Sequence, residues 1–274
     1  MVIKIRNVTH TYSPVTPWEF TALSNVDLTI NEGMVLGLIG GVGSGKSTLA
    51  SLIAGIGTPV TGSITIDGSL PHPGKNVGIL LQQPEEFFFE NTVFADIAFG
   101  LKNMGLTEHE INKRIDSTLD MIGLDHFVLD KSPFHLSRGT ARLAALASVL
   151  AMRTKYLILD EPTVNMDSKS KKKILGVIRN LSEKVTVIYI SHQIHEVSAI
   201  SDQMCVLGHG RVLFSGSTAK YKQWAFKENK EDLLPVIDQV MYGLKELGMD
   251  INTDVFGLDD AVSNIQIALK RGKQ

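Results

Sequence analysis

Apolar residues follow one pattern at the start of the chain and another further along it. Between residues 2 and 8, and again between 26 and 30, apolar positions alternate with polar ones, which predicts two strands. Continuous apolar runs follow, of the kind found in parallel strands that are buried on both faces. Helical segments separate these runs, so we predict an α/β fold whose strands are joined by crossover helices. The runs cover residues 34–39, 77–81, 156–159 and 185–190.

Two longer stretches lack strand patterns and predict helices. Residues 84–152 read almost entirely as helix, and Thr107 and Glu110 are spaced as a capping box at one helix start. Beyond a predicted hairpin at 204–214, apolar residues recur every three or four positions up to Gly248, and again at 258–269. We therefore divide the chain into a domain at 1–216, with a helical subdomain at about 84–152, and a C-terminal helical segment at 217–274.

Residues 40–47 carry the strongest chemical signal in the sequence. They read Gly-Gly-Val-Gly-Ser-Gly-Lys-Ser, which fits the phosphate-loop pattern G-x-x-x-x-G-K-[ST] between a buried strand and a helix. The glycines let backbone N–H groups surround a phosphate, and the helix that follows presents its positive end to it. Lys46 is expected to reach the β- and γ-phosphates of ATP, and the Ser47 hydroxyl to contact Mg²⁺. The predicted nucleotide-binding residues here are Gly40, Gly41, Val42, Gly43, Ser44, Gly45, Lys46, Ser47 and Thr48.

Polar residues also end three of the predicted strands. Asp160 and Glu161 follow the run at 156–159, where Asp160 would hold the hydration shell of Mg²⁺ and Glu161 would deprotonate an attacking water. Gln82 follows the second run and is a candidate contact to Mg²⁺ or to that water. His192 comes just after the fourth run and is a candidate partner of the γ-phosphate. Each also has an ordinary interpretation, because acids at strand ends are often simply solvated and isolated histidines are usually surface or core residues.

Composition narrows the class of protein. Apolar residues make up 43% of the chain and charged residues 20%, which is typical of a globular protein and excludes a disordered one. The net charge of −2 supplies no attraction to nucleic acid. No apolar stretch is long enough to span a bilayer, and the lone Cys205 excludes an internal disulfide, so we expect a cytosolic location. The one basic run is most simply a solvated helix face; it comprises Lys169, Lys171, Lys172 and Lys173.

The order of these motifs resembles that of the ATP-binding cassette (ABC) ATPases over residues 1 to about 216. In chain order, the motifs are the phosphate loop, Gln82, the segment Leu-Ser-Arg-Gly-Thr at 136–140, Asp160, Glu161, Asp167 and His192. The resemblance implies a P-loop NTPase cassette with a mostly parallel core sheet, antiparallel strands at the N-terminus, a helical insertion and a C-terminal helical segment. It also implies catalytic roles for Lys46, Glu161 and His192, and metal binding by Ser47, Gln82 and Asp160.

In this family the segment at 136–140 is the signature, which grips the γ-phosphate bound to the loop of a second chain. By resemblance, Ser137 and Gly139 would do so together with the positive end of their helix, and hydrolysis would need two chains. The segment departs from the usual Leu-Ser-Gly-Gly-Gln at Arg138 and Thr140, and the usual arginine further along the helix is Leu143. Arg138 would either obstruct closure or supply charge to the phosphate. We favour a weakened signature, and hence two unequal sites in a heterodimer.

Two further residues occupy positions to which the family assigns roles. Tyr12 stands where ABC ATPases usually stack an aromatic ring on adenine; alternatively, it is a strand-end tyrosine packed on the sheet. Asp167 corresponds to the aspartate that couples the two sites across the dimer interface, and its alternative role is a helix cap before Ser168.

Within the family, the stretches at 82–89 and 92–100 look like those of the energy-coupling factor (ECF) group of vitamin and metal-ion importers. The segment Thr-Pro-Trp-Glu at 16–19, before Ala22 and Leu23, is similar to the second of the two ATPase types in this group. The tail resembles the segment that pairs two ATPase subunits in this group. The resemblance implies an ATP-hydrolysing subunit held peripherally on the cytoplasmic side of the cell membrane. Its partners would be a second ATPase, a transmembrane scaffold that docks through a coupling helix, and a substrate-binding membrane subunit. The apolar floor of the docking groove would be formed by Phe87, Phe88 and Phe89, although at least one of them is expected in the intradomain core.

Two other functions remain open. A soluble ABC ATPase acting on DNA or the ribosome is disfavoured by the near-neutral charge, the single cassette and the lack of a long coiled-coil insert. A binding-only regulatory cassette is suggested by the altered signature.

Overall fold

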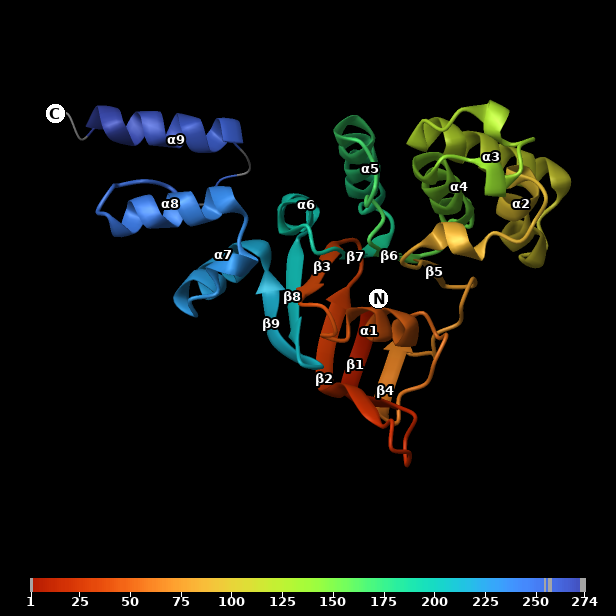
Figure 1. Cartoon of the computed structure of the whole chain (residues 1–274), viewed down its shortest axis with the longest axis horizontal. Helices are drawn as coiled ribbons and strands as arrows, with labels where there is room; N and C mark the ends of the chain where they lie inside the picture. Colours follow the sequence, from red (N-terminus) through yellow and green to blue (C-terminus); the bar gives the residue numbers. More distant parts are fainter. Residues whose placement is uncertain (1, 254, 256–257, 272–274) are drawn as a thin grey trace.

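A six-stranded sheet forms the centre of the structure, a computed structural model that describes residues 2–253, 255 and 258–271 (Figure 1). Its strands are β3 (Val35–Gly40), β5 (Val77–Leu80), β6 (Tyr156–Asp160), β7 (Thr186–Ile190), β8 (Gln203–Gly208) and β9 (Arg211–Ser217). Their order across the sheet is β5-β6-β7-β3-β8-β9, and the first five run parallel. β9 pairs antiparallel with β8 as the predicted hairpin. The four apolar runs are thus confirmed as parallel strands, and every residue of β6 and β7 is buried.

A second sheet of three antiparallel strands comes mostly from the start of the chain. It consists of β1 (Val2–Tyr12), β2 (Phe20–Asn31) and β4 (Thr61–Ile66), in the order β2-β1-β4. The antiparallel N-terminal strands implied by the resemblance are therefore confirmed. β4 was not predicted, because its sequence has only Ile64 and Ile66 as apolar positions and contains Gly62.

Helix α1 (Lys46–Ile53) lies between the two sheets, and α5 (Ser168–Leu181) and α6 (Ile194–Ile200) cover the opposite face of the larger one. The alternation of side chains along β3 divides the core accordingly. Leu36 and Leu38 pack with α1 and the N-terminal sheet, whereas Val35 and Ile39 pack in the cluster that includes α5 and α6.

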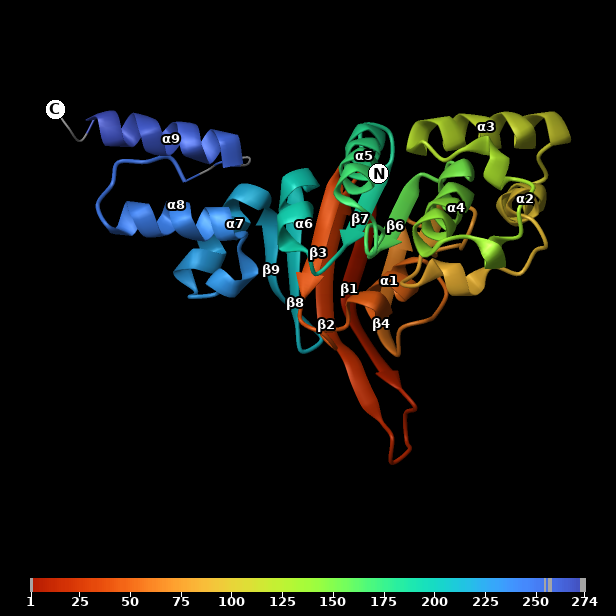
Figure 2. The same ribbon diagram turned by 45° about the horizontal axis from the view of Figure 1, so that its top comes forward.

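The helices between β5 and β6 form one end of the molecule (Figure 2). They are α2 (Val93–Asn103), α3 (Glu108–Ile122) and α4 (Arg138–Ala151), with short 3₁₀ turns η1 (Pro84–Phe87), η2 (His126–Val128) and η3 (Pro133–His135). The predicted capping box is confirmed, since the Thr107 side chain accepts from the Glu110 N–H while the Glu110 carboxylate accepts from the Thr107 N–H. The helical prediction for 84–152 is borne out by these elements.

Three helices form the opposite end, as Figure 1 shows: α7 (Thr218–Lys227), α8 (Val236–Glu246) and α9 (Leu258–Arg271), with the turn η4 (Glu231–Leu233). Both helices predicted from the apolar spacing are present, and α8 ends just before Gly248, which has a positive φ of 86°. A small apolar cluster packs this end and includes Met241, Ile251 and Ala261. The division of the chain at 216/217 remains a prediction, and residues 272–274 of the predicted tail lie outside the described residues.

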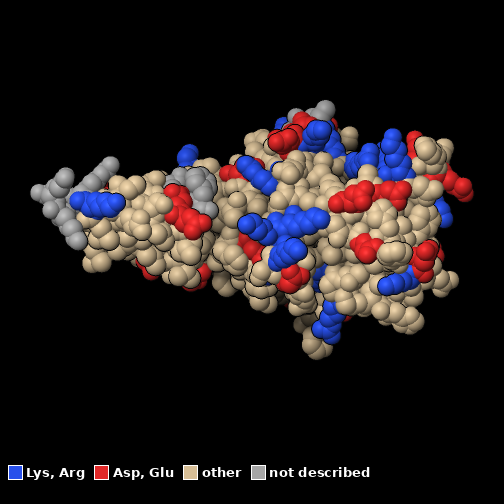
Figure 3. All heavy atoms as spheres, turned by 90° about the horizontal axis from the view of Figure 1, so that it is seen from above, with Lys and Arg blue, Asp and Glu red and all other residues tan. Residues whose placement is uncertain are grey.

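Charged side chains of both signs are present on the surface, and one lysine of the predicted solvated basic run is not simply solvated. Figure 3 shows acidic and basic side chains interspersed over most of the upper face, whereas the end that carries α9 is mostly uncharged. In the described part of the chain, no helix is long and apolar enough to cross a membrane. Lys171 is the exception to the predicted solvated helix face, because its Nζ lies 3.0 Å from Glu196 Oε1, a carboxylate whose side chain is only 4% exposed.

Candidate nucleotide site

The carboxyl ends of three adjacent strands bring the predicted site residues to one edge of the larger sheet. β6, β7 and β3 are neighbours and run parallel, so the segments that follow them emerge side by side. The phosphate loop follows β3, Asp160 and Glu161 end β6, and Ser191 and His192 follow β7. Such an edge is where open α/β sheets bind their ligands.

Two positions of the phosphate loop lie so close to a neighbouring backbone that only glycine fits there. Gly45 has a φ of +100°, and a Cβ there would lie 2.6 Å from the carbonyl oxygen of Ala22. A Cβ on Gly40 would lie 2.2 Å from the Leu207 carbonyl oxygen. The Lys46 ammonium folds over the loop and donates to the carbonyls of Gly40 and Gly41, at 2.9 Å each. Burial lowers the pKa of Lys46, although the charges of the nearby strand-end acids oppose that effect.

Asp160 contacts the loop directly. The Ser47 hydroxyl donates to Asp160 Oδ2 at 2.7 Å. Burial raises the pKa of Asp160, and the charge of Glu161 adds to this, while the Ser47 hydrogen bond and Lys46 act in the opposite direction. The hydroxyl, this carboxylate and the exposed Gln82 amide are hard oxygen donors of the kind Mg²⁺ prefers, so the residues present fit a magnesium ion that also binds phosphate oxygens. No group of three or more His, Cys, Asp or Glu side chains suited to hold a metal occurs within the described ranges.

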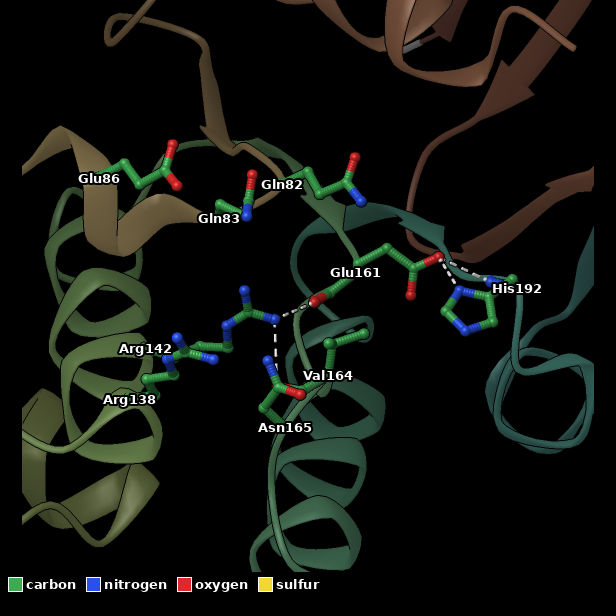
Figure 4. Close-up of a pocket in the computed structure, with 9 residues that line it drawn as sticks. All are labelled: Gln82, Gln83, Glu86, Arg138, Arg142, Glu161, Val164, Asn165 and His192. Atoms are coloured by element: carbon green, nitrogen blue, oxygen red, sulfur yellow. Dashed lines mark hydrogen bonds and ion pairs between the residues drawn. The ribbon is translucent and has the colours of Figure 1, made fainter. Parts of the chain in front are cut away.

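Glu161 is held at both carboxylate oxygens, and Figure 4 shows its contacts with His192. Its Oε1 accepts from the backbone N–H of His192 at 2.8 Å and lies 2.7 Å from His192 Nδ1. Its Oε2 accepts from the Ser191 hydroxyl at 2.9 Å. The Glu161 side chain is 8% exposed and the His192 side chain 69% exposed, so the imidazole is the more accessible of the two groups. The sequence analysis gave no role to Ser191, although its position just before His192 was a usable signal.

Arg142 is a second residue that the sequence analysis did not assign. This buried side chain of α4 donates from Nη1 to the carbonyl oxygens of Glu161 and Val164, at 2.9 and 3.1 Å. Glu161 itself has a φ of 53°, an uncommon conformation for a non-glycine residue. The arginine therefore anchors an unusual backbone turn from the helical end of the molecule.

A cavity of about 390 Å³ is lined by Arg142, Glu161 and His192, among other residues. Figure 4 shows Arg138 and Arg142 entering it from α4, with Gln82, Gln83 and Glu86 on the segment after β5. Its lining residues are Gln82, Gln83, Glu86, Arg138, Arg142, Glu161, Val164, Asn165 and His192. The structure thus brings together the predicted Gln82, Glu161 and His192, and it places the unusual signature residue Arg138 in the lining of the same cavity.

The rest of the signature lies at the start of α4. The Ser137 hydroxyl accepts from the backbone N–H of Thr140 and lies 2.8 Å from its Oγ1, so Ser137 caps the helix. A Cβ on Gly139 would meet no atom within 4 Å, which leaves the backbone there open to a ligand. Neither Ser137 nor Gly139 lines the cavity around Glu161 of the same chain.

Asp167 has the geometry of a helix cap. It caps α5 by accepting from the backbone N–H groups of Lys169 and Ser170, and hydrogen bonds from Ser170 lower its pKa. Its role at a dimer interface remains a prediction.

Aromatic residues border the loop on the side of the N-terminal sheet. Tyr12 is half-exposed and its hydroxyl lies 3.1 Å from Thr48 Oγ1. A hollow of about 160 Å³ is lined by Phe20, Ala22 and residues 43–48. Phe20 was absent from the predicted site, because only its partner strand brings it to the loop. Adenine stacking on Tyr12 remains a prediction.

The phenylalanine trio divides as expected. Phe88 is buried in the main core cluster, whereas Phe87 and Phe89 are 60% and 58% exposed. A groove of about 170 Å³ is lined by Phe87 and Phe88, together with Pro84 and Asp96.

Comparisons with known proteins agree with this geometry. The family described as "ABC transporter" matches residues 23–164. The energy-coupling factor transporter ATP-binding protein EcfA2 of Clostridium acetobutylicum is 40% identical over 286 aligned residues that cover 100% of both chains. The protein of the same name from Clostridium perfringens is 39% identical and covers 95% of this chain and 96% of its own.

Two solved structures share the fold. A dimer of the ATP-binding cassette MJ0796, bound to ADP and Pi in a post-hydrolysis state, superposes with a TM-score of 0.73 at 27% identity, over 79% of this chain and 98% of that one. The structure of cbiO1 from Clostridium perfringens, described as part of the ABC transporter complex cbiONQ, gives a TM-score of 0.70 at 32% identity, over 90% and 96%. The chain therefore belongs to the ABC transporter ATPases, and within them to the group of the energy-coupling factor ATP-binding proteins.

Proposed function

We propose that the chain is the ATP-binding and hydrolysing subunit of an ECF-type importer that takes up a vitamin or metal ion. It would lie peripherally on the cytoplasmic side of the cell membrane, beside a transmembrane scaffold and a separate substrate-binding subunit. The names of its relatives support this assignment. The observation that carries it is the 2.7 Å hydrogen bond from Ser47 to Asp160, because it joins the phosphate loop to the strand-end acids across 113 residues of sequence.

In this proposal the loop residues 40–48 surround the phosphates, and Lys46 donates to them in place of the carbonyls that it now contacts. Ser47, Gln82 and Asp160 would hold Mg²⁺, which supplies neutralisation of phosphate charge when bound. The hydrogen bond between Ser47 and Asp160 places these two proposed metal-binding groups side by side.

Glu161 is proposed to take the proton of the attacking water at one of its carboxylate oxygens. Its two oxygens are already oriented by Ser191 and His192, which limits their freedom to turn away. The exposed ring of His192 is proposed to contact the γ-phosphate and to lose that contact after hydrolysis.

Two cassettes are proposed to close face to face around the nucleotide. Ser137 and Gly139 would contact the phosphate on the partner's loop, and Asp167 would lie at the dimer interface. Their absence from the cavity of their own chain and the open backbone at Gly139 support this assignment. The partner is proposed to be a different ATPase subunit, so that the two sites are unequal.

The tail at 217–274 is proposed to pair the two ATPase subunits. Several apolar side chains on α8 and α9 are exposed, including Val236 at 74%, Leu247 at 86% and Leu258 at 71%. Exposed apolar surface of this extent is typical of an interface. Deletion of the tail is expected to weaken pairing while the remaining chain still binds nucleotide, and size-exclusion chromatography with the partner subunit measures this.

The groove lined by Phe87 and Phe88 is proposed to receive the coupling helix of the scaffold, with the exposed Phe89 as a further contact. Exposed aromatic rings next to a buried anchor, here Phe88, suit an amphipathic helix laid into a groove. Co-purification from detergent-solubilised membranes tests the proposal, since Phe87→Ala with Phe89→Ala is expected to reduce recovery of the scaffold.

ATP turnover of the complex purified from membranes tests the catalytic assignment. Glu161→Gln is expected to lower kcat by about 10²- to 10⁴-fold, the contribution of a general base. Glu86→Gln is the matched control, because it makes the same chemical change on another acid of the same cavity, and turnover should persist. Equal turnover in wild type and Glu161→Gln would show that this acid is not the base.

A binding-only regulatory cassette is the second candidate, and Arg138 is the observation that favours it. Its side chain lines the cavity that also holds Glu161, at a position where the usual signature has a glycine. Restoring the signature with Arg138→Gly and Thr140→Gln in the assembled complex is expected to raise turnover if the signature is weakened. No change in turnover would remove this argument for a regulatory cassette.

A further inference from the structure

A buried carboxylate lies on α6, four residues beyond His192. The Glu196 side chain is only 4% exposed, and it does not line the cavity that holds Glu161 and His192. It is therefore not placed to touch a ligand in that cavity. Any effect of Glu196 on hydrolysis has to act through other residues.

One oxygen of this carboxylate contacts the segments that follow β6 and end β7. The Thr163 hydroxyl donates to Glu196 Oε2 at 2.5 Å, and the Tyr189 hydroxyl donates to the same atom at 3.1 Å. Both of these residues are fully buried. Because Thr163 is the second residue after Glu161, this oxygen connects α6 to the segment of the proposed base.

The other oxygen, Oε1, contacts α5. Lys171 Nζ donates to it at 3.0 Å and also donates to Gln193 Oε1 at 2.8 Å. Gln193 directly follows His192, and the Lys171 backbone N–H donates to the carbonyl oxygen of Asp167 at 2.9 Å. This lysine therefore connects the His192 segment to the start of the helix that Asp167 caps.

Stability alone does not account for a charged group at this place. Burial raises the pKa of Glu196, but hydrogen bonds from Thr163 and Lys171 hold it below its ordinary value, so the carboxylate is ionised at neutral pH. Apolar side chains of similar volume often give the same stability as a buried ion pair or more. What the carboxylate adds is a defined arrangement of three chain segments, 161–163, 167–171 and 192–196, around one point.

We propose that Glu196 is a positioning residue for ATP hydrolysis, which holds the His192 segment in place against the segments of Glu161 and Asp167. This inference rests on the proposed function, because it assumes that Glu161 and His192 act at the γ-phosphate. Without the carboxylate, the imidazole would no longer be fixed where it contacts that phosphate. Neither Glu196 nor its partners line the hollow of the phosphate loop, so ATP binding itself should change little.

Glu196→Gln tests the proposal, because it keeps the size of the side chain and replaces one acceptor oxygen by an NH₂ donor that faces other donors. ATP turnover is measured in the complex purified from membranes, and the affinity of the full chain for the β,γ-imido analogue of ATP by calorimetry. The variant is expected to lower kcat by about 10- to 100-fold, the effect of a small misplacement of a reacting group, at nearly unchanged analogue affinity. Lys171→Met should lower kcat in the same way.

Asp67→Asn is the matched control. Asp67 also accepts from a lysine and a tyrosine, Lys155 Nζ at 2.8 Å and the Tyr156 hydroxyl at 2.7 Å. Tyr156, however, begins β6, whereas Asp160 ends it, so this carboxylate lies at the other end of the strand from the site. Asp67→Asn should lower Tm without lowering kcat. Tm is measured for every variant, and turnover is compared at a temperature at which all of them are folded.

A mutant cycle with His192→Ala shows whether Glu196 acts through the imidazole. The double variant Glu196→Gln with His192→Ala is expected to turn over as fast as His192→Ala alone. Wild-type kcat in Glu196→Gln, an equal loss of kcat in Asp67→Asn, or additive effects in the cycle would overturn the proposal. If His192→Ala and Glu161→Gln both keep wild-type turnover, the proposed function itself fails and this inference fails with it.

Discussion

A buried ion pair joins two of the C-terminal helices to each other. Lys222 on α7 places its Nζ 2.9 Å from Asp238 Oδ1 on α8, and the side chains are only 8% and 2% exposed. The same ammonium donates to the carbonyl oxygen of Val255 at 3.1 Å. One charged group therefore connects two helices and the segment that leads into α9.

Replacing Lys222 by methionine should destabilise this end of the molecule by about 3–5 kcal/mol, because it leaves the Asp238 carboxylate buried without its counter-ion. An adjoining cavity of about 650 Å³, lined by both residues, gives water access to the acid and favours the lower end of that range. The exposed pair of Arg179 and Asp202 is the matched control. Its atoms are 2.7 Å apart but its side chains are 50% and 35% exposed, so Arg179→Met should cost about 1 kcal/mol or less.

Tryptophan fluorescence can follow this end alone. The chain has two tryptophans: Trp224 on α7 stacks on Phe214 at a centroid distance of 5.0 Å, and Trp18 is 82% exposed. Urea unfolding of the Trp18→Phe chain, monitored at Trp224, would report the loss of α7 packing. The double variant Lys222→Met with Asp238→Leu should recover most of the lost stability, because an apolar pair replaces the ionic one. A Lys222→Met cost no larger than that of Arg179→Met would refute the reasoning.

Two further predictions concern the core. Burial alone would raise the pKa of Glu196, but hydrogen bonds from Thr163 and Lys171 hold it below its ordinary value of 4.5, so the stability it contributes is present above that pH and lost as pH falls through the lower folded value. Glu196→Gln should therefore flatten the acid dependence of Tm below about pH 4.5, and an unchanged profile would contradict the linkage. Phe88→Ala should cost about 3–5 kcal/mol in chemical unfolding, since the ring is buried, whereas the exposed Phe87→Ala should cost little; equal costs would contradict the assigned burial.

The main strands were predictable because burial on both faces leaves a continuous apolar run in the sequence. Residues 156–160 show the effect, since the strand is buried throughout and its end is marked by the first acid. β4 was missed for the converse reason: it lies in a three-stranded sheet, and half of its residues are exposed. A pattern of two isoleucines is too short to distinguish such a strand from a loop.

The phosphate loop and the strand-end acids were also predictable, because each is a short motif whose chemistry depends on neighbours in sequence. Phe20 was not, since its place beside residues 43–48 depends on how β2 pairs with β1. The contact of Arg142 with the Glu161 backbone was not predictable either, since Arg142 lies in an alanine-rich helix whose pattern indicates packing only. Contacts between distant segments are set by the tertiary fold, which a local pattern does not encode.

The environment of Glu161 shows why the sequence predicts the chemical type of this site but not its geometry. Its backbone is held by Arg142 from the helical end, and its carboxylate by Ser191 and His192 from the end of the neighbouring strand. Neither contact alone defines the position of the acid, because one fixes the peptide and the other the side chain. Since α4 also begins with the segment at 136–140, the buried Arg142 guanidinium links that helix to the Glu161 peptide. The position of the acid therefore depends on two elements far apart in the sequence, α4 and the segment after β7, and no local motif contains both.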